Sequence, residues 1–376
     1  MRKILILIGR YLPGYKDGGP IRSITNLTEA LGEEYDFRIV CLDRDLGDSE
    51  PYSNIEKDQW NAVGKAKVWY VKPGGYTFSL IRKLAAEVDL IYSCGFYGDY
   101  GYKTLMLNRL GKLDGKPVIV APMGTFSEGA LSHKSLKKKL FICGCKWLGL
   151  FNAIKWSVTS ELEKADVQKN IGWAAECVIA EDLPRTNIPG IAAGRNAGDA
   201  LKVVFLSRIC PQKNLLGAIQ CLQQVHSQVE FTIYGPLEDV TYWETCKEQL
   251  DKLPGNVRWH YDGVVSAEEV QKKLQQHDVF LFPTKGENYG HVIFEALSVG
   301  CIPIISDQTM WGMIAERNAG YIIPLSDEMT AFAKTIDDMA AIEPQRMSKM
   351  SQNAVALAQE KVNNAVATTG YRYVFN

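Results

Sequence analysis

The sequence predicts an α/β protein built from two doubly wound domains, each with a parallel sheet. Short apolar segments recur along the chain without alternating polar residues, which is typical of strands buried on both faces of a sheet. Segments with helical periodicity separate many of them, which favours helices packed on both faces of each sheet. The chain has 376 residues, more than one hydrophobic core usually covers, so we expect two such domains.

The first domain is predicted from apolar segments in the N-terminal half of the chain. They lie at 4–8, 37–42, 68–71, 89–93 and 117–121. Residues 23–35, between the first two segments, have the apolar spacing of an amphipathic helix. Ligands bind at the carboxyl ends of the strands in open parallel sheets, so the loop after residues 4–8 is a candidate for a binding site.

The second domain is predicted from a similar series in the C-terminal half. Its apolar segments lie at 202–207, 229–235, 256–261, 278–283 and 302–306. A helix is predicted over 266–277, with Ser266 as its N-cap and Glu269 completing a capping box. With two domains of this kind, the natural site for a ligand is the cleft between them.

A segment of different composition separates the two series. Residues 184–200 are rich in Gly, Ala, Pro and Asn and have no strong periodicity, which is typical of a linker. We therefore place the first domain at 1–190 and the second at 191–361.

Composition limits the functional classes. The formal net charge is -1, so nothing favours a nucleic-acid partner. The nine Cys residues are scattered and form no CxxC pair, which is typical of reduced thiols in a cytosolic protein. The apolar run at 4–8 is too short for a signal peptide, and no stretch approaches the length of a transmembrane helix. We expect a cytoplasmic protein.

Two carboxylates stand in a segment that is otherwise suited to burial. Glu287 follows the strand 278–283 in a loop, and Glu295 falls on the second turn of the next predicted helix. Free backbone N–H groups near Tyr289 to His291 would form an anion site at the start of that helix. A phosphate flanked by two acids that accept hydrogen bonds from hydroxyls fits a sugar nucleotide. The alternative is a Glu favoured by the helix dipole and a second, solvated Glu.

Two cations follow the strand 202–207. Arg208 and Lys213 lie in the loop at its carboxyl end, where they would suit a diphosphate leaving group. They could neutralise the charge that develops as the glycosidic C–O bond breaks, without a metal ion. The alternative is a pair of solvated loop cations.

A glycine pair follows the first strand. Gly18 and Gly19 precede a predicted helix, and glycines allow the backbone to approach a ligand closely. The segment contains no GxGxxG, which argues against a nicotinamide cofactor. The alternative is a flexible turn.

Together these patterns resemble the retaining glycosyltransferases of family 4, also called glycosyl transferases group 1. GENYGHVIFEAL (286–297) is similar to the family's E-x7-E signature, and SRICPQKN (207–214) to its Arg…Lys phosphate clamp. NVRWHYDGVVSAEEV (256–270) resembles the segment that holds the nucleotide base, and TSELEK (159–164) matches a common motif of the first domain. The resemblance covers nearly the whole chain and is most specific in its C-terminal half.

The resemblance implies a GT-B fold, with two Rossmann-like domains facing across a cleft, and roles for particular residues. Glu295 would bind the ribose, Glu287 the donor sugar, and Arg208 with Lys213 the diphosphate. Glu287, Arg208 and Lys213 are therefore the candidate catalytic residues. Other candidate donor-binding residues are Gly18, Gly19, Tyr261, Asn288, Tyr289, Gly290 and His291. By the same resemblance, residues 362–376 would return to the first domain.

The activity implied is transfer of a hexose, with retention, from a nucleotide diphosphate sugar to a hydroxyl of a saccharide or lipid-linked saccharide. The expected donor is UDP-linked, the expected context is assembly of a surface polysaccharide or glycoconjugate, and no metal or other cofactor is expected. Two alternatives stay open: a sugar-nucleotide 2-epimerase of the same fold, and a catalytically silent sugar-nucleotide-binding protein.

Two departures from the family pattern bear on the first domain. Where many relatives have a Pro-Asn-Gly turn, this chain has AEDLPRTN (180–187). Where some relatives place a His near the donor sugar, residues 121–131 contain none, and we assign no catalytic role to the following His133.

A basic segment suggests where the protein acts. No acidic residue lies between Glu128 and Glu161, and the segment 131–156 contains several lysines. Its apolar residues at helical spacing are Leu136, Leu140, Cys143 and Trp147. Such a helix can rest on an anionic bilayer, which would suit a lipid-linked acceptor and a peripheral location on the membrane. The alternative is a solvated basic face over ordinary core residues.

Overall fold

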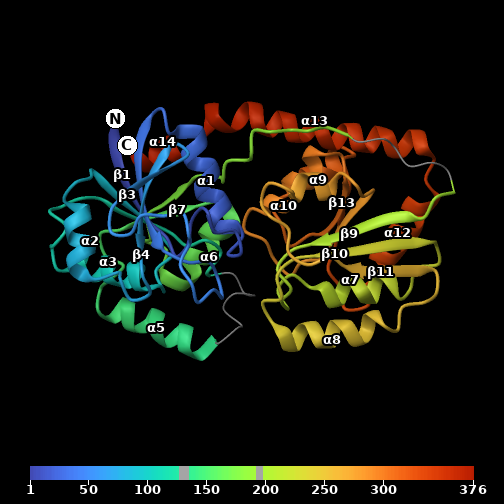
Figure 1. The fold of residues 1–376 in the computed structure, drawn as a ribbon, viewed down its shortest axis with the longest axis horizontal. Helices are drawn as coiled ribbons and strands as arrows, with labels where there is room; N and C mark the ends of the chain where they lie inside the picture. Colours follow the sequence, from blue (N-terminus) through green and yellow to red (C-terminus); the bar gives the residue numbers. More distant parts are fainter. Residues whose placement is uncertain (127–134, 192–197) are drawn as a thin grey trace. The chain divides into compact units, whose positions relative to one another are not determined.

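The computed structural model describes residues 1–126, 135–191 and 198–376 and contains two compact α/β units (Figure 1). The first unit comprises Met1–Leu183 together with Ala365–Asn376, and the second comprises Pro184–Asn364. These divisions lie a few residues from the boundaries at 190 and 361 that the sequence predicts. The C-terminal residues 365–376 belong to the first unit.

The first unit is built on an eight-stranded sheet in the order β3-β4-β2-β1-β5-β6-β7-β8. Every neighbouring pair is parallel except β3 and β4, which form an antiparallel hairpin. The strands are β1 (Arg2–Leu7), β2 (Tyr35–Leu42), β3 (Trp60–Val63), β4 (Ala66–Val71), β5 (Leu90–Cys94), β6 (Val118–Ala121), β7 (Lys155–Val158) and β8 (Cys177–Ile179). The strands predicted from apolar segments are confirmed. The sequence analysis missed β3, β7 and β8, which are short.

Helices cover both faces of this sheet, as expected for a doubly wound domain. They are α1 (Gly19–Leu31), α2 (Phe78–Ala85), α3 (Asp99–Arg109), α5 (Ser135–Trp147), α6 (Glu161–Ile171) and α14 (Tyr371–Phe375). Alternate residues of β1 show the two layers. Ile4 and Ile6 pack in one cluster with α1 and α14, whereas Leu5 and Leu7 pack in another with α2 and α3. Burial on both faces explains why β1 is apolar without alternation.

The C-terminal helix α14 is fixed to the first unit by aromatic packing. The ring of Phe375 lies 5.3 Å from that of Tyr35, 5.9 Å from that of Phe37 and 5.6 Å from that of Tyr92. All three contacts are edge-on, an arrangement that adds to the free energy gained from apolar burial.

The second unit is built on a six-stranded parallel sheet in the order β11-β10-β9-β12-β13-β14. Its strands are β9 (Leu201–Leu206), β10 (Val229–Tyr234), β11 (Val257–Tyr261), β12 (Val279–Phe282), β13 (Ile302–Ser306) and β14 (Tyr321–Ile323). Its helices are α7 (Leu215–Leu222), α8 (Val240–Leu250), α9 (Val270–Leu274), α10 (His291–Ser298), α11 (Met313–Glu316), α12 (Thr330–Ala341) and most of α13 (Pro344–Thr368). The strand order places β9 beside β12, so the loops after these two strands emerge together.

Two helix starts differ from the sequence prediction. Helix α1 begins at Gly19 rather than residue 23, because Pro20 suits the first turn of a helix. Helix α9 begins only at Val270, so the capping box at Ser266 is wrong. The Ser266 hydroxyl instead donates to the Glu269 carboxylate over 2.8 Å, within the turn that precedes the helix.

A buried acid joins three elements of the first unit. The carboxylate of Glu163, in α6, accepts hydrogen bonds from the Gly124 N–H at 2.6 Å and from the Thr159 N–H at 2.8 Å. It also accepts one from the Thr159 hydroxyl at 3.1 Å. Burial disfavours the charged form and raises the pKa of Glu163 to about 7, although these hydrogen bonds act in the opposite direction.

We expect Glu163 to make stability depend on pH. In the unfolded chain the carboxyl ionises near its ordinary pKa of 4.5, while the folded form holds its proton until the pH reaches the folded pKa of about 7. The free energy of unfolding should therefore fall by roughly 3 kcal/mol between these pH values. Glu163→Gln should remove this slope in urea unfolding measured from pH 4.5 to 7.5. An unchanged slope in the variant would show that other groups cause it.

Candidate functional site

The loops after β9 and β12 bring two of the predicted site residues into contact. The Lys213 ammonium donates to the Glu287 carboxylate, and the two side chains are only 12% and 11% exposed. The backbones of the two loops are also joined, since the Lys285 N–H donates to the Gln212 carbonyl over 2.9 Å. The sequence placed both residues at strand ends but did not predict the ion pair. An ammonium group has three donors, so Lys213 can hold Glu287 and still donate to a ligand.

Asn214 strengthens this junction between the two loops. It is the N-cap of α7 in the left-handed conformation, and its side-chain oxygen accepts from the Gly217 N–H over 3.2 Å. Its amide donates to the Pro283 carbonyl over 2.8 Å. Asn214 therefore fixes the position of the preceding Lys213 relative to β12.

Arg208 stands at the carboxyl end of β9, as predicted. Its guanidinium group lies 2.5 Å from the carboxylate of Glu238, which is in the loop after β10. The Arg208 side chain is 34% exposed, so a ligand can reach it. The sequence analysis missed Glu238, although its position after an apolar strand was a signal that could have found it. A guanidinium offers five N–H donors, of which Glu238 uses only part.

A glycine allows the ends of three strands to converge beside Arg208. Gly235 follows β10 with φ of +140°, and a Cβ atom there would overlap the carbonyl oxygen of Ser207. The Gly235 N–H donates to the Gly263 carbonyl over 2.8 Å, and its carbonyl accepts from the Tyr261 hydroxyl over 2.9 Å. The sequence analysis also missed this residue. Only glycine fits so close to the neighbouring backbone.

The side chain of Tyr261 helps to hold these strand ends together. Its ring packs on that of Trp243 with centroids 4.7 Å apart, and its hydroxyl is committed to Gly235. The predicted contact with a nucleotide base was assigned to the backbone near Tyr261 and Gly263. A backbone contact does not need the Tyr261 side chain, which is used for packing, so the contact with the base stays a prediction.

The start of α10 presents the second part of the site. Gly290 is its N-cap in the left-handed conformation, with φ of +79° and ψ of +56°. Tyr289 is buried, and its carbonyl accepts from the Trp311 indole N–H over 2.6 Å. The rings of Tyr289 and His291 lie 4.7 Å apart. The segment from Asn288 to His291 is thus held in place by aromatic packing, with backbone N–H groups at the helix start.

Glu295 lies on the second turn of α10, as the sequence predicts, and is 2% exposed. A carboxylate this deeply buried has a large desolvation cost, so its retention favours a functional role. His291 precedes it by four residues and therefore lies on the same face of the helix. The structure thus places Glu287, His291 and Glu295 in succession along one loop and helix.

The predicted glycine pair belongs to the first unit, whereas the other candidate residues belong to the second. Gly18 is the N-cap of α1 with φ of +70° and ψ of -119°, a conformation that favours glycine. Gly19 begins the helix, and a Cβ atom there would meet nothing within 4 Å. The backbone here is therefore open to an approaching molecule. His133, to which we assigned no role, lies outside the described residues.

Across the described ranges, no group of three or more His, Cys, Asp or Glu side chains is arranged to hold a metal ion. Metal independence stays a prediction, because the bound substrates could themselves bring an ion.

The described part of the basic segment has an exposed apolar stripe. Helix α5 presents Leu136, Leu140 and Trp147, which are 71%, 64% and 84% exposed, and Cys143 is also exposed. The alternative interpretation, in which these residues belong to the core, is wrong for this part of the segment. Buried side chains such as Ile142 and Cys145 hold the opposite side of the helix against the sheet. Nowhere in the described chain is there a helix long and apolar enough to span a bilayer.

Comparisons with known proteins agree with this architecture. Residues 191–356 match the family model described as Glycosyl transferases group 1. A GDP-mannose:cellobiosyl-diphosphopolyprenol alpha-mannosyltransferase of Xanthomonas oryzae pv. oryzae (strain PXO99A) is 24% identical over 265 residues. That match covers 68% of this chain and 65% of the relative, so it spans slightly less than two thirds of the relative's length.

Solved structures match the whole chain. Anabaena HepE, in complex with UDP and glucose, has a TM-score of 0.72 and 16% identity, with 100% of this chain and 98% of that chain covered. Sucrose-phosphate synthase from Thermosynechococcus elongatus has a TM-score of 0.75 and 16% identity, with 100% and 99% covered. Because the sequence identity is only 16%, these structures are evidence about the fold alone. They confirm the predicted GT-B class with two parallel-sheet α/β domains.

Proposed function

We propose that this protein is a retaining glycosyltransferase that moves a hexose from a UDP-linked sugar to a hydroxyl of a saccharide or lipid-linked saccharide. One observation carries the proposal: Lys213 and Glu287 meet at the carboxyl ends of adjacent parallel strands, beside the start of α10. These residues lie inside the region that matches Glycosyl transferases group 1. The proposed setting is polysaccharide or glycoconjugate assembly on the cytoplasmic side of a membrane.

In this proposal the protein acts by positioning and by electrostatic stabilisation. Arg208 and Lys213 hold the diphosphate and stabilise the negative charge that grows on it as the bond to the anomeric carbon breaks. Their partners Glu238 and Glu287 keep both cations oriented towards the loops after β9, β10 and β12. A preorganised cation needs little rearrangement when the charge develops, and this lowers the barrier.

Two acids, one in α10 and one in the loop before it, contact the ribose and the transferred sugar of the donor. The buried Glu295 accepts hydrogen bonds from the ribose hydroxyls, and Glu287 contacts the transferred sugar. Backbone N–H groups at the start of α10, near Asn288 to His291, add donors for a phosphate oxygen. Gly18 and Gly19 of the first unit approach the donor phosphate and the acceptor, and the backbone near Tyr261 contacts the base.

A donor screen tests this function. Release of nucleoside diphosphate is measured for UDP-linked and GDP-linked hexoses against a panel of free and lipid-linked saccharides. GDP-mannose is included because the Xanthomonas relative is named for it. Transfer from a UDP-hexose with retained anomeric configuration supports the proposal. An inverted product, or no transfer from any donor with any acceptor, contradicts it.

The same assay separates the two alternatives, which the comparisons do not favour. A 2-epimerase would convert the donor when it is incubated alone, and NMR of the sugar nucleotide would show the epimer. A catalytically silent protein would bind UDP in calorimetry without transfer or hydrolysis.

Transfer is expected to continue in EDTA, because Arg208 and Lys213 supply the positive charge that a metal ion provides in other phosphate sites. The rate is measured in buffer treated with chelating resin, with and without EDTA. An unchanged rate agrees with the expectation. A loss of transfer that magnesium restores would contradict it.

The proposal includes contact with an anionic membrane through α5. The exposed stripe of Leu136, Leu140 and Trp147 could enter the interface between headgroups and acyl chains. Exposed lysines, among them Lys137 and Lys139, lie on the same helix beside the stripe. This combination of apolar and cationic side chains matches the chemistry of an anionic bilayer surface.

Flotation with lipid vesicles tests the membrane contact. The protein should float with vesicles rich in phosphatidylglycerol, less with phosphatidylcholine alone, and less at high salt, because the attraction of the lysines is screened. Trp147→Ala should weaken the association. Trp173→Ala is a matched control, since Trp173 is 81% exposed in the same unit but lies outside α5. Equal flotation of both variants would contradict the role of α5.

A further inference from the structure

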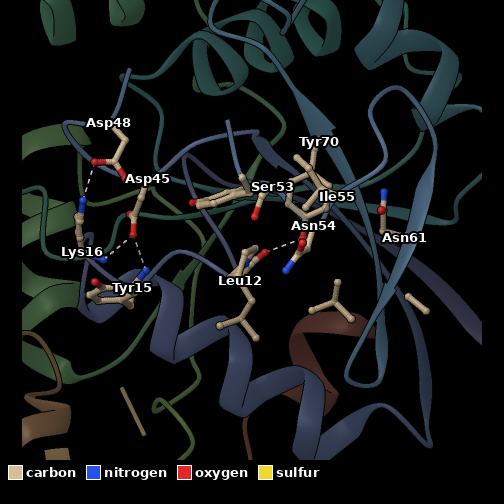
Figure 2. A pocket seen from close by; sticks show the side chains of 14 residues that line it. Leu12, Tyr15, Lys16, Asp45, Asp48, Ser53, Asn54, Ile55, Asn61 and Tyr70 are labelled. Atoms are coloured by element: carbon tan, nitrogen blue, oxygen red, sulfur yellow. Dashed lines mark hydrogen bonds and ion pairs between the residues drawn. The ribbon is translucent and has the colours of Figure 1, made fainter. Parts of the chain in front are cut away.

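In each unit, a candidate loop is held by the loop that follows the neighbouring strand. Figure 2 shows this in the first unit, where the Asp45 carboxylate, in the loop after β2, accepts from the Tyr15 N–H at 2.8 Å and from the Lys16 N–H at 3.1 Å. In the second unit, β13 lies beside β12. Residues 307–312, which we call the β13 loop, therefore emerge next to the loop that carries Glu287.

Two hydrogen bonds join the β13 loop to residues 287–291, which we call the donor segment. The Glu287 N–H donates to the Gln308 carbonyl over 3.1 Å. Two residues further on, the Tyr289 carbonyl accepts from the Trp311 indole N–H over 2.6 Å. The β13 loop thus fixes two peptide groups of the donor segment, and with them the positions of the Glu287 carboxylate and the first N–H groups of α10.

Trp311 contacts the donor segment with its ring as well as its N–H. Its side chain is 1% exposed, and its ring meets that of Tyr289 edge-on with centroids 5.5 Å apart. A Cβ atom on Gly290 would lie 3.5 Å from the indole nitrogen, so the N-cap of α10 is also beside Trp311. Because a buried N–H group without its acceptor has a large free-energy cost, Trp311 and Tyr289 favour a single arrangement.

Helix α13 holds the indole in place. The Lys361 ammonium lies 5.6 Å from the centroid of the Trp311 ring, a cation–π contact. The preceding residue, Glu360, forms an ion pair with Arg317 at 3.0 Å. Arg317 is the C-cap of α11, the helix that begins two residues after Trp311. Both contacts fasten α13 to the chain around the β13 loop.

We propose that Trp311 is a positioning residue for sugar transfer and that Lys361 supports it. The proposal rests on the proposed function for the reaction that Trp311 affects. Trp311 acts through Tyr289 and the backbone, which hold the Glu287 carboxylate and the N–H groups at the start of α10 towards the transferred sugar and its phosphate. A displacement of about 1 Å can lower a reaction rate by about 100-fold, so such support has a direct effect on turnover.

Loss of this support should affect the transferred sugar more than the nucleotide. Arg208 and Lys213, which would hold the diphosphate, follow β9, and β12 separates β9 from β13 in the sheet. The affinity for UDP should therefore change little when the β13 loop is perturbed, while kcat falls. A residue with only a structural role would instead lower thermal stability, or lower kcat and the amount of bound UDP together.

Trp311→Phe tests the proposal, because it keeps an aromatic ring and removes the N–H donor. We expect kcat for transfer to fall by about tenfold or more at a temperature at which the variant is folded. The Kd for UDP, measured by calorimetric titration, should change by less than about twofold. Trp69→Phe is the matched control, since the indole N–H of Trp69 is buried but has no hydrogen-bond partner among the described residues. Its kcat should stay near native.

Lys361→Met tests the support from α13, because it removes the cation and keeps a long side chain. We expect kcat to fall by about two- to fivefold, the size of a cation–π contact. Lys349→Met is the matched control, since Lys349 is an exposed lysine on the same helix. If Trp311→Phe fails to fold, this pair of variants decides the proposal.

Hydrogen exchange of the full chain, without sugar or nucleotide, tests the support apart from catalysis. Amides of the donor segment should exchange faster in Trp311→Phe than in the native chain and in Trp69→Phe, while those of β9 are unchanged. The proposal is overturned if this exchange is unaltered, if kcat stays native, or if kcat and UDP binding fall together. Absence of transfer by the native chain would contradict the proposed function instead, and the exchange rates would still show whether Trp311 holds the donor segment.

Discussion

Alanine at Lys213 is expected to lower the rate of sugar transfer by about 10²–10³-fold, the usual effect of removing a group that stabilises charge in a transition state. The variant loses a cation near the diphosphate and also leaves Glu287 without its ion-pair partner in a site that is 11% exposed. The second effect costs stability, by about 3–5 kcal/mol for a fully buried pair and less here. Glu295→Ala should also lower transfer by one or more orders of magnitude, because the ribose loses a hydrogen-bond acceptor.

Controls distinguish catalysis from folding in this experiment. Lys285→Ala removes an exposed lysine from the loop after β12 and should leave transfer near native. The double variant Lys213→Ala with Glu287→Gln removes the uncompensated charge, so it should recover stability without recovering transfer. Thermal unfolding is measured for each variant. If Lys213→Ala and Glu295→Ala are folded and transfer sugar at near-native rates, the assignment of the site is wrong.

The largest effect on stability is expected for Gly235→Ala. The residue has φ of +140°, a conformation that side chains rarely adopt, and a Cβ atom there would overlap the Ser207 carbonyl oxygen. Relief of this overlap requires β9 and β10 to separate at their carboxyl ends, so we expect a loss of about 4 kcal/mol in the free energy of unfolding. Any folded fraction should also transfer sugar slowly, because Arg208 directly follows Ser207.

Urea unfolding of Gly235→Ala is compared with that of Gly255→Ala. Gly255 lies in the same unit, but a Cβ atom there would meet nothing within 4 Å, so this substitution should change stability little. Equal unfolding midpoints for the two variants would show that the backbone near Gly235 relaxes without cost.

Sequence patterns predicted the local features of the fold and part of the site. The predicted strands formed where apolar residues run without alternation, because burial on both faces of a sheet requires side chains of that kind. Glu295 was placed on the second turn of its helix because the length of the strand and loop before it fixes the start of α10. Short edge strands such as β3 were missed, since β3 is partly exposed and has no continuous apolar run.

The sequence by itself determined the α/β class, the residues that end the strands of the second sheet, and the cationic and acidic character of the loops. Each of these features depends on residues that are close together along the chain, so it can be predicted from the local sequence. Tertiary structure alone decided which charges meet. Lys213 pairs with Glu287 because β9 lies beside β12, although the two residues are far apart along the chain. It likewise decided that Gly235 is confined and that the stripe on α5 is exposed, because both features require surfaces that only folding brings together.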